Sequence, residues 1–579
     1  SISIISVRFC YFDFLMGLLS WAFKNLQIFL FDFQLNGLKI VISKSLLLFN
    51  IGFILILELI CIVLTNRIRL GTDICAFICV MFNIANHFIY EFRGTPIIAS
   101  DIATISTAAE VASSYEIKFN WYLLVTLLLL FDFFMVGRVI KCKPVFSKKK
   151  FRLCGIIVMA IISVVGVKQF ILTDYLDNHG LKLSLFNPMR SYRTYGSIAG
   201  FSRSIHYSIL KKPEGYSLEK VEEITSKYES DTVDKTKEHP NVIVVINEAF
   251  SDLKDLGDFE TNEDYMPFVH SILRGEVANT ISGYTDVSVL GGNTANSEFE
   301  FLTGNSMAFF PNGSVPYLQY IRDGISTIVP QLEEYGYTTY GTHPYRAKGW
   351  NREFIYDLMG FDYRYFQGSF PFEDKLRNYV SDEADFKSIL EWRNNTEGPF
   401  FMFNVTMQNH SNYGGDFDNF DPQIVAKFKN TSSNKYLNKY LSLMYETDQD
   451  VASLLSELSQ SDRKTIVVFW GDHQPNDYVV RPIYKEYGLD FDNQTYEQQQ
   501  QRQKTPFFIW ANYDIQEQTN VEISLNYLNI LLFETAGLQL DEYQTFRKNL
   551  WQGQIPMMNA VGYRNDDGDL VEYDDAPEE

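Results

Sequence analysis

Four long apolar segments in the first third of the chain limit the folds open to it. They span residues 46–64, 74–90, 121–137 and 153–172, and a fifth at 2–23 is apolar but contains Arg8 and Asp13. Each is long enough to cross the hydrocarbon core of a bilayer as a helix. Buried core helices are the alternative, but 46–64 and 121–137 are nearly free of charge and flanked by basic residues. We therefore predict an N-terminal polytopic α-helical membrane domain at 1–172, with about five spans.

Basic loops between these segments predict the orientation. The connection before the last segment contains Lys141, Lys143, Lys148, Lys149, Lys150 and Arg152, and the short 65–71 turn contains Arg67 and Arg69. Loops rich in Lys and Arg stay on the cytoplasmic side. Everything after Leu172 is then expected outside the cell, with the chain anchored in the cell membrane as a multi-pass protein.

Charge and cysteine content differ between the two parts of the chain. Through residue 200 there are 19 Lys and Arg against 11 Asp and Glu, whereas the rest has 31 against 60. An acidic domain of this kind argues against a nucleic-acid partner and favours divalent cations. All six cysteines lie before residue 155, so the acidic part has no disulfide framework, thiolate zinc site or cysteine nucleophile.

The acidic part has the pattern of an α/β domain. A connector at 173–240, charged and helical over 211–240, leads to short apolar runs at 242–246, 338–342, 400–405, 465–470 and 507–510. Apolar runs that alternate with helical stretches predict a largely parallel sheet. We place this extracellular domain at 241–565 and expect the acidic tail at 566–579 to be disordered.

Two of the apolar runs end in acids. Glu248 follows the first run directly, and Asp472 with His473 follows the run at 465–470. Ligands of open α/β sheets gather at the carboxyl ends of the strands. A charge at the end of a buried strand must face solvent, a metal or a partner, because an unpaired buried charge is costly. Solvated loop residues are the alternative for either acid alone.

A threonine in a glycine-rich turn is the candidate nucleophile. Thr294 follows Gly291, Gly292 and Asn293, with Asn293 as the expected N-cap of a helix at 295–302. The helix dipole and a divalent cation would both lower the pKa of its hydroxyl. Two carboxylates, one imidazole and one alkoxide suit Mn²⁺ or Mg²⁺, with Zn²⁺ as an alternative. A plain helix-start residue is the other interpretation.

Further polar residues near strand ends are candidates for substrate binding. His343 and His410 each follow an apolar run, and Trp350 and Arg352 lie shortly after His343. Arg352 is suited to pair bidentately with a phosphate, and Trp350 to pack on a glycerol or sugar. Histidines at strand ends are often structural, which is the alternative for His343 and His410.

Taken together, these motifs resemble the lipoteichoic acid synthase family, whose members have an extracellular domain of the sulfatase and alkaline-phosphatase type behind a polytopic membrane domain. The matching segments are Asn247-Glu248, Gly292-Asn293-Thr294-Ala295-Asn296-Ser297-Glu298-Phe299, Trp350-Asn351-Arg352, Asn409-His410 and Trp470-Gly471-Asp472-His473. The resemblance implies that Glu248, Thr294, Asp472 and His473 bind one Mn²⁺-type ion and that Thr294 is the nucleophile. It implies that His343, Trp350, Arg352 and His410 line a phosphoglycerol pocket.

The same resemblance implies a reaction. Glycerol phosphate would pass from phosphatidylglycerol to Thr294 with release of diacylglycerol, and then to the hydroxyl of a glycolipid or glycopolymer. The sequence departs from the polymerising synthases around Glu248 and at Tyr345. Residues 301–306 and 93–97 look more like relatives that decorate cell-wall polysaccharide, so the acceptor stays open.

Three other functions compete. A true sulfatase needs a Cys or Ser nucleophile, whereas this position is Thr294. A phosphoethanolamine transferase shares the membrane anchor, the threonine and the metal, but its domain is usually stapled by disulfides. A non-catalytic scaffold in envelope assembly is the third, and the intact set of Glu248, Thr294, Asp472 and His473 argues against it.

Overall fold

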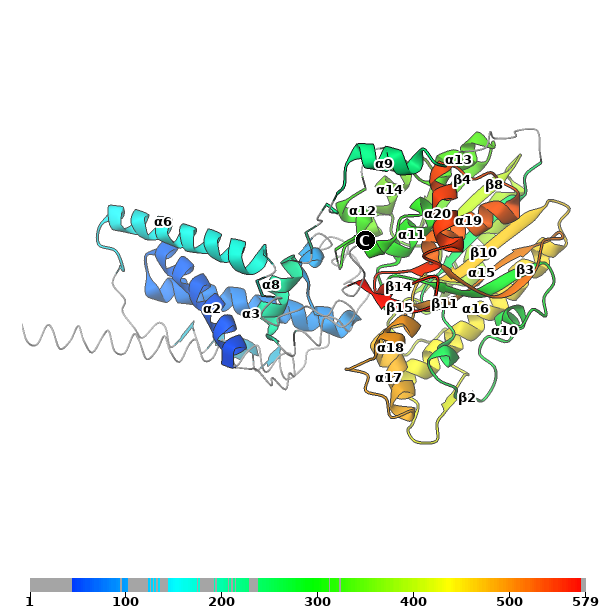
Figure 1. Cartoon of the computed structure of the whole chain (residues 1–579). Coiled ribbons are helices and arrows are strands. Elements are labelled where there is room, and N and C mark those ends of the chain that lie inside the picture. Colours follow the sequence, from blue (N-terminus) through cyan, green and yellow to red (C-terminus); the bar gives the residue numbers. More distant parts are fainter. Residues whose placement is uncertain are drawn as a thin grey trace, which may run out of the picture. The chain divides into compact units, whose positions relative to one another are not determined.

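The structure, a computed structural model, describes residues 44–93, 96–102, 144–173 and 238–573 without 312, 322 and 323, and short stretches within 123–135 and 175–228. The chain divides into two compact units, Ser1–Ile102 with Ser113–Ile209, and Ala103–Ala112 with Leu210–Glu579. The described part of the first unit is helical, and the second combines helices with a large sheet (Figure 1).

Helices make up the described part of the first unit. The helices α2 and α3 pack closely because Gly71 of α3 lacks a side chain: a Cβ there would lie 2.5 Å from the backbone of Ile62 of α2. A buried cluster that includes Ile54, Cys61 and Cys75 fills the contact. The elements are α2 (Lys44–Thr65), α3 (Ile68–Arg93), η1 (Ala99–Ile102), α6 (Lys149–Gly166), η2 (Val167–Ile171) and α8 (Ser197–His206).

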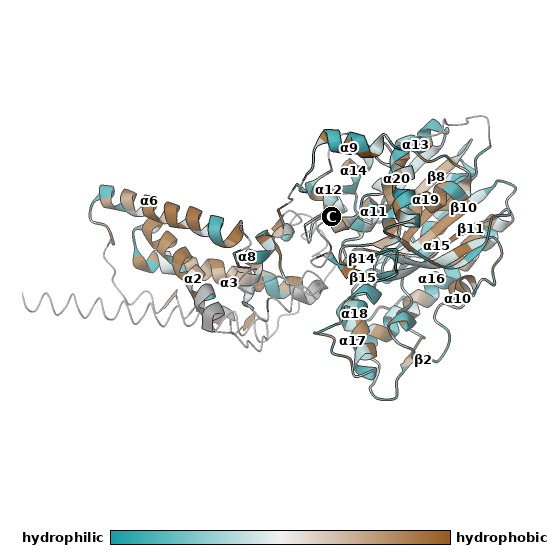
Figure 2. Ribbon diagram, in the orientation of Figure 1, coloured by the Kyte–Doolittle hydropathy of each residue, from teal (hydrophilic) through white to brown (hydrophobic). Residues whose placement is uncertain are grey.

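Two helical stretches in the described residues, Ile68–Ile89 and Lys149–Ile171, are long and apolar enough to cross a membrane, and Asn50–Thr65 is a shorter apolar helix. None of the residues of α6, all of which the structure describes, is buried, and most of them are hydrophobic (Figure 2). The predicted span at 2–23 lies outside the described residues, and so do eight of the 17 residues of the span at 121–137. The number of spans stays a prediction.

The turn between α2 and α3 is shorter than expected. Because α3 begins at Ile68, only Asn66 and Arg67 connect the helices, and Arg69 lies in the first helical turn. The side chain of Asn66 exchanges two hydrogen bonds with the backbone of Phe146, at 3.1 and 2.8 Å. The two basic loops therefore lie side by side, as a common side of the membrane requires.

The second unit is built on an eight-stranded sheet in the order β12-β3-β11-β10-β1-β8-β4-β5. The five strands from β10 to β5 run parallel, and β11 pairs antiparallel with both of its neighbours. The predicted largely parallel sheet is thus confirmed. The strands are β1 (Asn241–Asn247), β3 (Thr280–Asp286), β4 (Thr338–His343), β5 (Tyr363–Phe366), β8 (Phe400–Val405), β10 (Thr465–Gly471), β11 (Lys504–Ala511) and β12 (Gln518–Ser524).

Helices cover both faces of this sheet. Val242, Val244 and Ile246 of β1 belong to one buried cluster, and Ile243 and Val245 belong to the other. A strand buried on both faces reads as a continuous apolar run, as β1 does. One face packs against α11 (Thr294–Thr303), α13 (Ile328–Glu334), α14 (Arg352–Leu358) and α19 (Leu525–Ala536), and the other against α10 (Pro267–Leu273), α15 (Asp382–Asn394), α16 (Lys435–Ser459) and α17 (Asp477–Glu486).

Shorter elements complete the unit. They are α9 (Leu218–Thr225), η4 (Leu253–Leu256), η5 (Met307–Phe309), α12 (Pro316–Gln319), η6 (Gly349–Asn351), α18 (Tyr496–Gln501) and α20 (Glu542–Gln552), with the strands β2 (Glu260–Thr261), β6 (Lys375–Leu376), β7 (Tyr379–Val380), β9 (Ala426–Lys427), β13 (Met557–Met558), β14 (Gly562–Arg564) and β15 (Leu570–Glu572).

Two expectations differ from the structure. Of the charged segment 211–240, the described residues are helical only at α9. Ser217 is the N-cap residue of this helix. Pro213 and Gly215, which precede it, disfavour an earlier start. The acidic tail is not disordered up to residue 573, because β15 pairs with β14. The hydroxyl of Tyr573 anchors this hairpin by donating to the carbonyls of Asn559 and Gly562.

Candidate metal and nucleophile site

The register of two neighbouring strands brings the predicted acids together. Strands β1 and β10 run parallel, and Asn247 is paired with Gly471 at their carboxyl ends. Glu248 and Asp472 are the next residues of each strand, and His473 follows. A Cβ at Gly471 would lie 1.7 Å from the carbonyl oxygen of Phe250, so only glycine permits this close approach.

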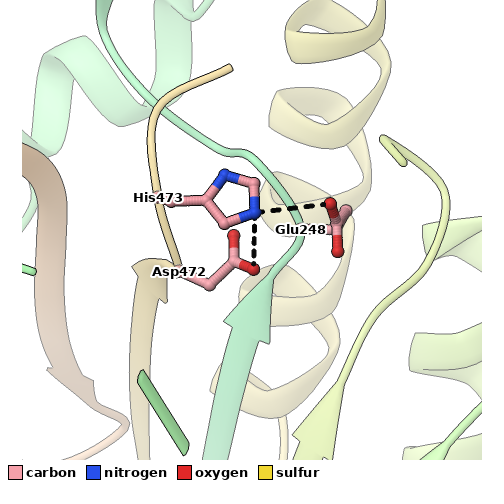
Figure 3. A group of neighbouring side chains, drawn as sticks. All are labelled: Glu248, Asp472 and His473. Atoms are coloured by element: carbon pink, nitrogen blue, oxygen red, sulfur yellow. Dashed lines mark ion pairs between the residues drawn. The ribbon is translucent and has the colours of Figure 1, made fainter. Parts of the chain in front are cut away.

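Three ligand atoms face one another at this edge (Figure 3). His473 Nε2 lies 3.3 Å from Asp472 Oδ2 and 3.7 Å from Glu248 Oε1. Among the described residues, these three form the one group of His, Cys, Asp or Glu whose ligand atoms all lie within 4.8 Å of each other. All three side chains are buried.

The chemistry of this group fits a cation. Asp472 Oδ2 and His473 Nε2 are buried and have no hydrogen-bond partner among the described residues. His473 Nδ1 lies 3.0 Å from the carbonyl oxygen of Gln474, so it carries the proton in the neutral tautomer and Nε2 keeps its lone pair. Burial, and then the charge of Asp472, raise the pKa of Glu248 well above its ordinary value. A divalent cation would satisfy all three groups at once.

Thr294 begins α11 beside this group. Its Oγ1 donates to Glu248 Oε2 at 3.4 Å, and Ser297, one turn further on, donates to the carbonyl oxygen of Asp472 at 2.7 Å. The helix therefore starts at the candidate metal ligands. Asn293 is the N-cap residue as predicted, but it lies at φ 65° and its side chain makes no capping hydrogen bond within the described helix. Its role is to turn the chain sharply into α11.

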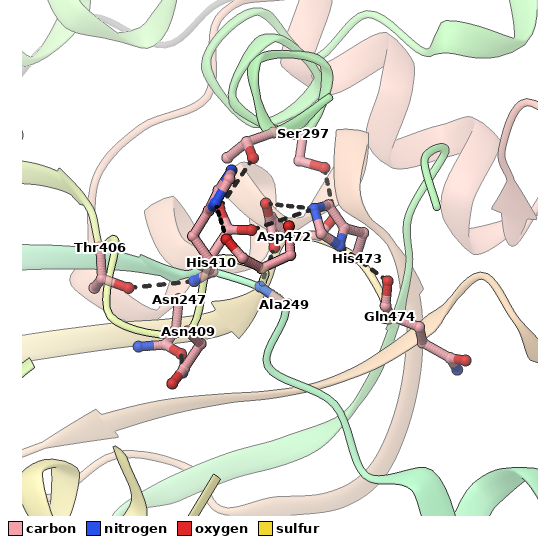
Figure 4. Close-up of polar contacts among 12 residues, drawn as sticks. Asn247, Ala249, Ser297, Thr406, Asn409, His410, Asp472, His473 and Gln474 are labelled. Atoms are coloured by element: carbon pink, nitrogen blue, oxygen red, sulfur yellow. Dashed lines mark hydrogen bonds and ion pairs between the residues drawn. The ribbon is translucent and has the colours of Figure 1, made fainter. Parts of the chain in front are cut away.

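Backbone and side-chain contacts hold the ligands in place (Figure 4). Asp472 Oδ1 accepts from the backbone N–H of Ala249 at 2.7 Å, and the N–H of Glu248 donates to Thr406 Oγ1 at 3.2 Å. Ala249 has φ 53°, a conformation that side chains other than glycine rarely adopt. Strain of this kind persists only where surrounding contacts enforce it.

Both predicted histidines lie near the carboxyl edge and are held neutral. His343 ends β4, and its Nδ1 is 2.8 Å from the carbonyl oxygen of Val405. Burial, and then the charge of Arg352, lower the pKa of His343 well below its ordinary value. Burial also lowers the pKa of His410 to about 4, with the charges of Arg377, His473 and Arg352 adding to the effect. The neighbouring Asn409 donates to Asn247 Oδ1 at 2.9 Å, so His410 lies at the same sheet edge as the candidate metal ligands.

Arg352 differs from the expectation. Its Nε and Nη2 donate to the fully buried Glu298, at 2.9 Å from Nε to Oε1 and 2.5 Å from Nη2 to Oε1. The bidentate edge that was predicted for a phosphate is therefore occupied by a carboxylate. Trp350, at φ 53°, is partly buried and packs against the core on the side of α11. The substrate-binding roles of both residues stay predictions.

Sequence reasoning missed Arg377 and Tyr379. Both belong to the small β6–β7 hairpin, and Arg377 donates to the carbonyl oxygen of His410 at 2.9 Å. The hydroxyl of Tyr379 lies 3.2 Å from His410 Nδ1. Nothing in the local sequence identifies them, because a two-residue β-turn of Arg and Asn is common on protein surfaces.

This architecture defines a class: an α/β domain of the alkaline-phosphatase and sulfatase type, with candidate metal-ligand side chains at the carboxyl edge of its sheet. The family profile described as Sulfatase matches residues 240–538, more than half of the chain. The chain belongs to the sulfatase family.

Similar proteins include "Putative cyclic beta-1,2-glucan modification protein" of Rhizobium meliloti (strain 1021), 29% identical over 381 residues, which cover 62% of this chain and 56% of the relative. "Lipoteichoic acid synthase 1" of Bacillus subtilis (strain 168) is 21% identical over 280 residues, covering 46% of this chain and 41% of the relative. The chain thus spans about half the length of these curated relatives. The predicted likeness to lipoteichoic acid synthases is confirmed.

A solved structure also matches. It is described as "Streptococcus pyogenes phosphoglycerol transferase GacH in complex with sn-glycerol-1-phosphate". It is 25% identical, with a TM-score of 0.50, and the match covers 60% of this chain and 90% of that chain. The chain is therefore similar in fold to a phosphoglycerol transferase whose structure was solved in complex with sn-glycerol-1-phosphate.

Proposed function

We propose that this protein transfers sn-glycerol phosphate from phosphatidylglycerol to a cell-envelope glycopolymer or glycolipid through a covalent intermediate on Thr294. The observation that carries the proposal is the buried contact of the Thr294 hydroxyl with Glu248, beside the unpartnered Asp472 Oδ2 and His473 Nε2. The likeness to a phosphoglycerol transferase supports this reaction over sulfate ester hydrolysis.

Glu248, Thr294, Asp472 and His473 are the residues that would hold the ion, most simply Mn²⁺, with Mg²⁺ or Zn²⁺ as alternatives. When bound, the cation would lower the pKa of the hydroxyl and stabilise charge on phosphoryl oxygens. Asp472 contacts both Ala249 and Ser297, and these contacts hold the ligand residues and the helix of Thr294 in fixed positions relative to each other.

The first step loads the threonine. Thr294 Oγ forms a bond to the phosphorus of phosphatidylglycerol, and the bond from phosphorus to the diacylglycerol oxygen breaks. The proton of Thr294 ends on that oxygen, so diacylglycerol leaves neutral. His343 and His410, both neutral because burial lowers their pKa, line the pocket without adding charge to it.

The second step unloads it. The hydroxyl oxygen of an acceptor forms a bond to phosphorus, the bond to Thr294 Oγ breaks, and the acceptor proton returns to Thr294. A polysaccharide or glycolipid acceptor is supported by the relative described as a cyclic glucan modification protein and by the lipoteichoic acid synthase. Acceptors of this kind lie in the bacterial cell envelope.

We further propose that the first unit is a multi-pass membrane anchor with the catalytic unit outside the cell. The apolar α6 has no buried residue among its described positions, and this surface is the kind that lipid covers. The contact of Asn66 with Phe146 joins the two basic loops, in agreement with the positive-inside rule.

Intact mass spectrometry of the full chain in detergent, incubated with Mn²⁺ and phosphatidylglycerol, tests the reaction. We expect a gain of one glycerophosphate together with released diacylglycerol, and neither in Thr294→Ala. Phosphatidylethanolamine is the matched donor control. An adduct with that lipid alone would make the protein a phosphoethanolamine transferase, and no adduct or diacylglycerol with either lipid would reject group transfer from phospholipids.

A further inference from the structure

Two buried arginines lie near the candidate site, and only one of them is neutralised. Arg352 forms an ion pair with Glu298 in which both side chains are inaccessible to solvent, and Tyr356 also donates to Glu298 at 2.8 Å. The pair is therefore close to neutral for any bound substrate. A buried ion pair whose two charges cancel orients the side chains around it but adds little to the net electrostatic field at the site.

Arg377 has no such partner. It lies in the turn of the β6–β7 hairpin, is 5% exposed, and has no carboxylate within ion-pair distance among the described residues. Its guanidinium instead donates to backbone carbonyls: Nη2 to Gln408 and His410, and Nη1 to Asn412. Its Nε is buried without a partner in the described chain. The rings of Tyr379, Tyr413 and Phe417 lie 5.7, 5.8 and 5.8 Å from this guanidinium. A positive charge held by carbonyl dipoles and aromatic rings, without a carboxylate partner, leaves a net field around it.

This field reaches the candidate site. Arg377 Nη2 donates to the carbonyl oxygen of His410 at 2.9 Å, which places its charge beside this histidine. The same hairpin supplies Tyr379, whose ring lies 5.4 Å from that of His410 and 6.0 Å from that of Tyr345. Tyr345 in turn lies 6.2 Å from the ring of His343. A continuous ring wall therefore runs from His343 to His410, with Arg377 behind it.

Charges around the site indicate what this arginine is for. Two carboxylates and a divalent cation sum to zero, and the Arg352–Glu298 pair adds nothing. Arg377 then supplies a positive charge next to the ring wall, which attracts a phosphodiester and repels a cationic head group. Specificity of this kind comes from an element that disfavours the wrong ligand.

We propose that Arg377 selects the donor head group, favouring phosphodiesters with an uncharged head such as glycerol and disfavouring those with an ammonium. This inference rests on the proposed function and concerns the donor of the same reaction. Arg377 also positions the 408–412 loop through its hydrogen bonds to backbone carbonyls. A test must therefore separate the effect of the positive charge from the effect of these hydrogen bonds, which brace the loop.

Three variants make that separation. Arg377→Met removes the charge and the bracing, whereas Arg377→Lys keeps the charge but loses the fork of donors. Arg393→Met is the matched control, because Arg393 is also buried and also donates to a carbonyl, that of Arg463, as well as to the hydroxyls of Ser461 and Thr465. These contacts lie at the opposite, amino end of β10.

The measurement is calorimetric binding of sn-glycerol 1-phosphate and of O-phosphoethanolamine to the full chain in detergent with Mn²⁺. The two probes share a phosphate, so the ratio of their affinities isolates the head group. We expect the wild type to prefer the glycerol compound at least tenfold, Arg377→Met to lose most of that preference, and Arg377→Lys and Arg393→Met to keep it. Thermal unfolding checks that each variant is folded.

An unchanged ratio in Arg377→Met would overturn the inference, and so would loss of preference in Arg377→Lys, since the arginine would then act only as a brace. If Arg377→Met does not fold, Arg377→Gln, which also removes the charge, takes its place with the same expected loss of preference. A wild type that binds neither probe, or prefers phosphoethanolamine, would instead count against the proposed function itself.

Discussion

The two edges of the central sheet are built from the same strands but in opposite ways. At the amino edge, polar groups are bonded densely: Asn512 accepts from the N–H of Thr465 and donates to three carbonyls, and Asn241 accepts from the N–H of Phe400 and from Arg463. At the carboxyl edge, Asp472 and His473 each leave a buried atom unpartnered in the described structure.

This difference indicates that the amino edge contributes mainly to folding stability and the carboxyl edge mainly to ligand binding. Buried polar groups normally find hydrogen-bond partners, and those that do not are candidates for ligand binding. The amino edge closes the ends of β1, β8 and β10 and is expected to carry stability. The carboxyl edge holds strained groups and buried atoms that have no partner among the described residues and that a ligand would complete. Substitutions at the two edges should therefore change different measurements.

The largest effect is expected from Thr294→Ala. Loss of the proposed nucleophile should lower turnover of phosphatidylglycerol by about a thousandfold or more, because the covalent intermediate can then not form on this residue. The melting temperature should change little, since the Thr294 hydroxyl makes only a long 3.4 Å contact with Glu248. Diacylglycerol release and thermal unfolding measure the two quantities. Turnover within tenfold of wild type would remove Thr294 from the reaction.

Asp472→Asn should weaken Mn²⁺ binding by about a hundredfold or more, because it removes a ligand charge. The metal-free protein should lose no stability, since this change relieves the repulsion that raises the pKa of Glu248. Mn²⁺ titration and melting with and without chelator measure both effects. Unchanged Mn²⁺ affinity would mean that the ion does not bind at this edge.

The grouping of the site, although not its roles, could be predicted from sequence. Glu248, Asp472 and His473 follow apolar runs, and parallel strands place such residues at one edge. Thr294 was assigned to the same site because of its glycine-rich turn and the resemblance to the family. The partner of Arg352 could not be predicted, because Glu298 lies 54 positions away on α11 and meets it only when α14 packs there.

Other features depend on geometry that the sequence pattern does not reveal. Arg377 is buried by contacts with the 408–412 loop, which no periodicity indicates. Strand β3 has no apolar run, and it pairs in the sheet because Gly283 allows the backbone of Val521 to approach, where a Cβ would lie 2.0 Å from its carbonyl oxygen. The fold class was therefore easier to predict than the strands at the two ends of the sheet, β12, β3 and β5.

At the amino edge, Asn512→Ala should lower the free energy of unfolding by about 2 kcal/mol, because the N–H of Thr465 and three carbonyls lose a partner. Turnover per folded molecule should stay near the wild-type value, since Asn512 lies at the far end of β10 from Asp472. Thermal unfolding and turnover of the folded fraction measure these. A turnover loss as large as that of Asp472→Asn would show that the two edges are not separable.

The smallest effect is the pH dependence of metal binding. In the metal-free protein, burial and then Asp472 raise the pKa of Glu248 well above its ordinary value. A carboxyl whose folded pKa is raised contributes stability below its unfolded pKa, and that contribution is lost as pH rises through the folded pKa. The cation must displace this proton, so Mn²⁺ affinity should fall as pH is lowered through the raised pKa, by at most about tenfold per pH unit for one proton.

Titrations between about pH 5 and about pH 8, in buffers of different ionisation enthalpy, count the protons released. His343 and His410 should not contribute, because burial lowers their pKa and keeps them neutral across most of this window. Asp472→Asn should move the dependence toward lower pH, since one of the two causes of the raised pKa is gone. Affinity that does not vary with pH would mean that Glu248 is already ionised before the ion arrives, and that the carboxyl edge is less strained than its unpartnered atoms indicate.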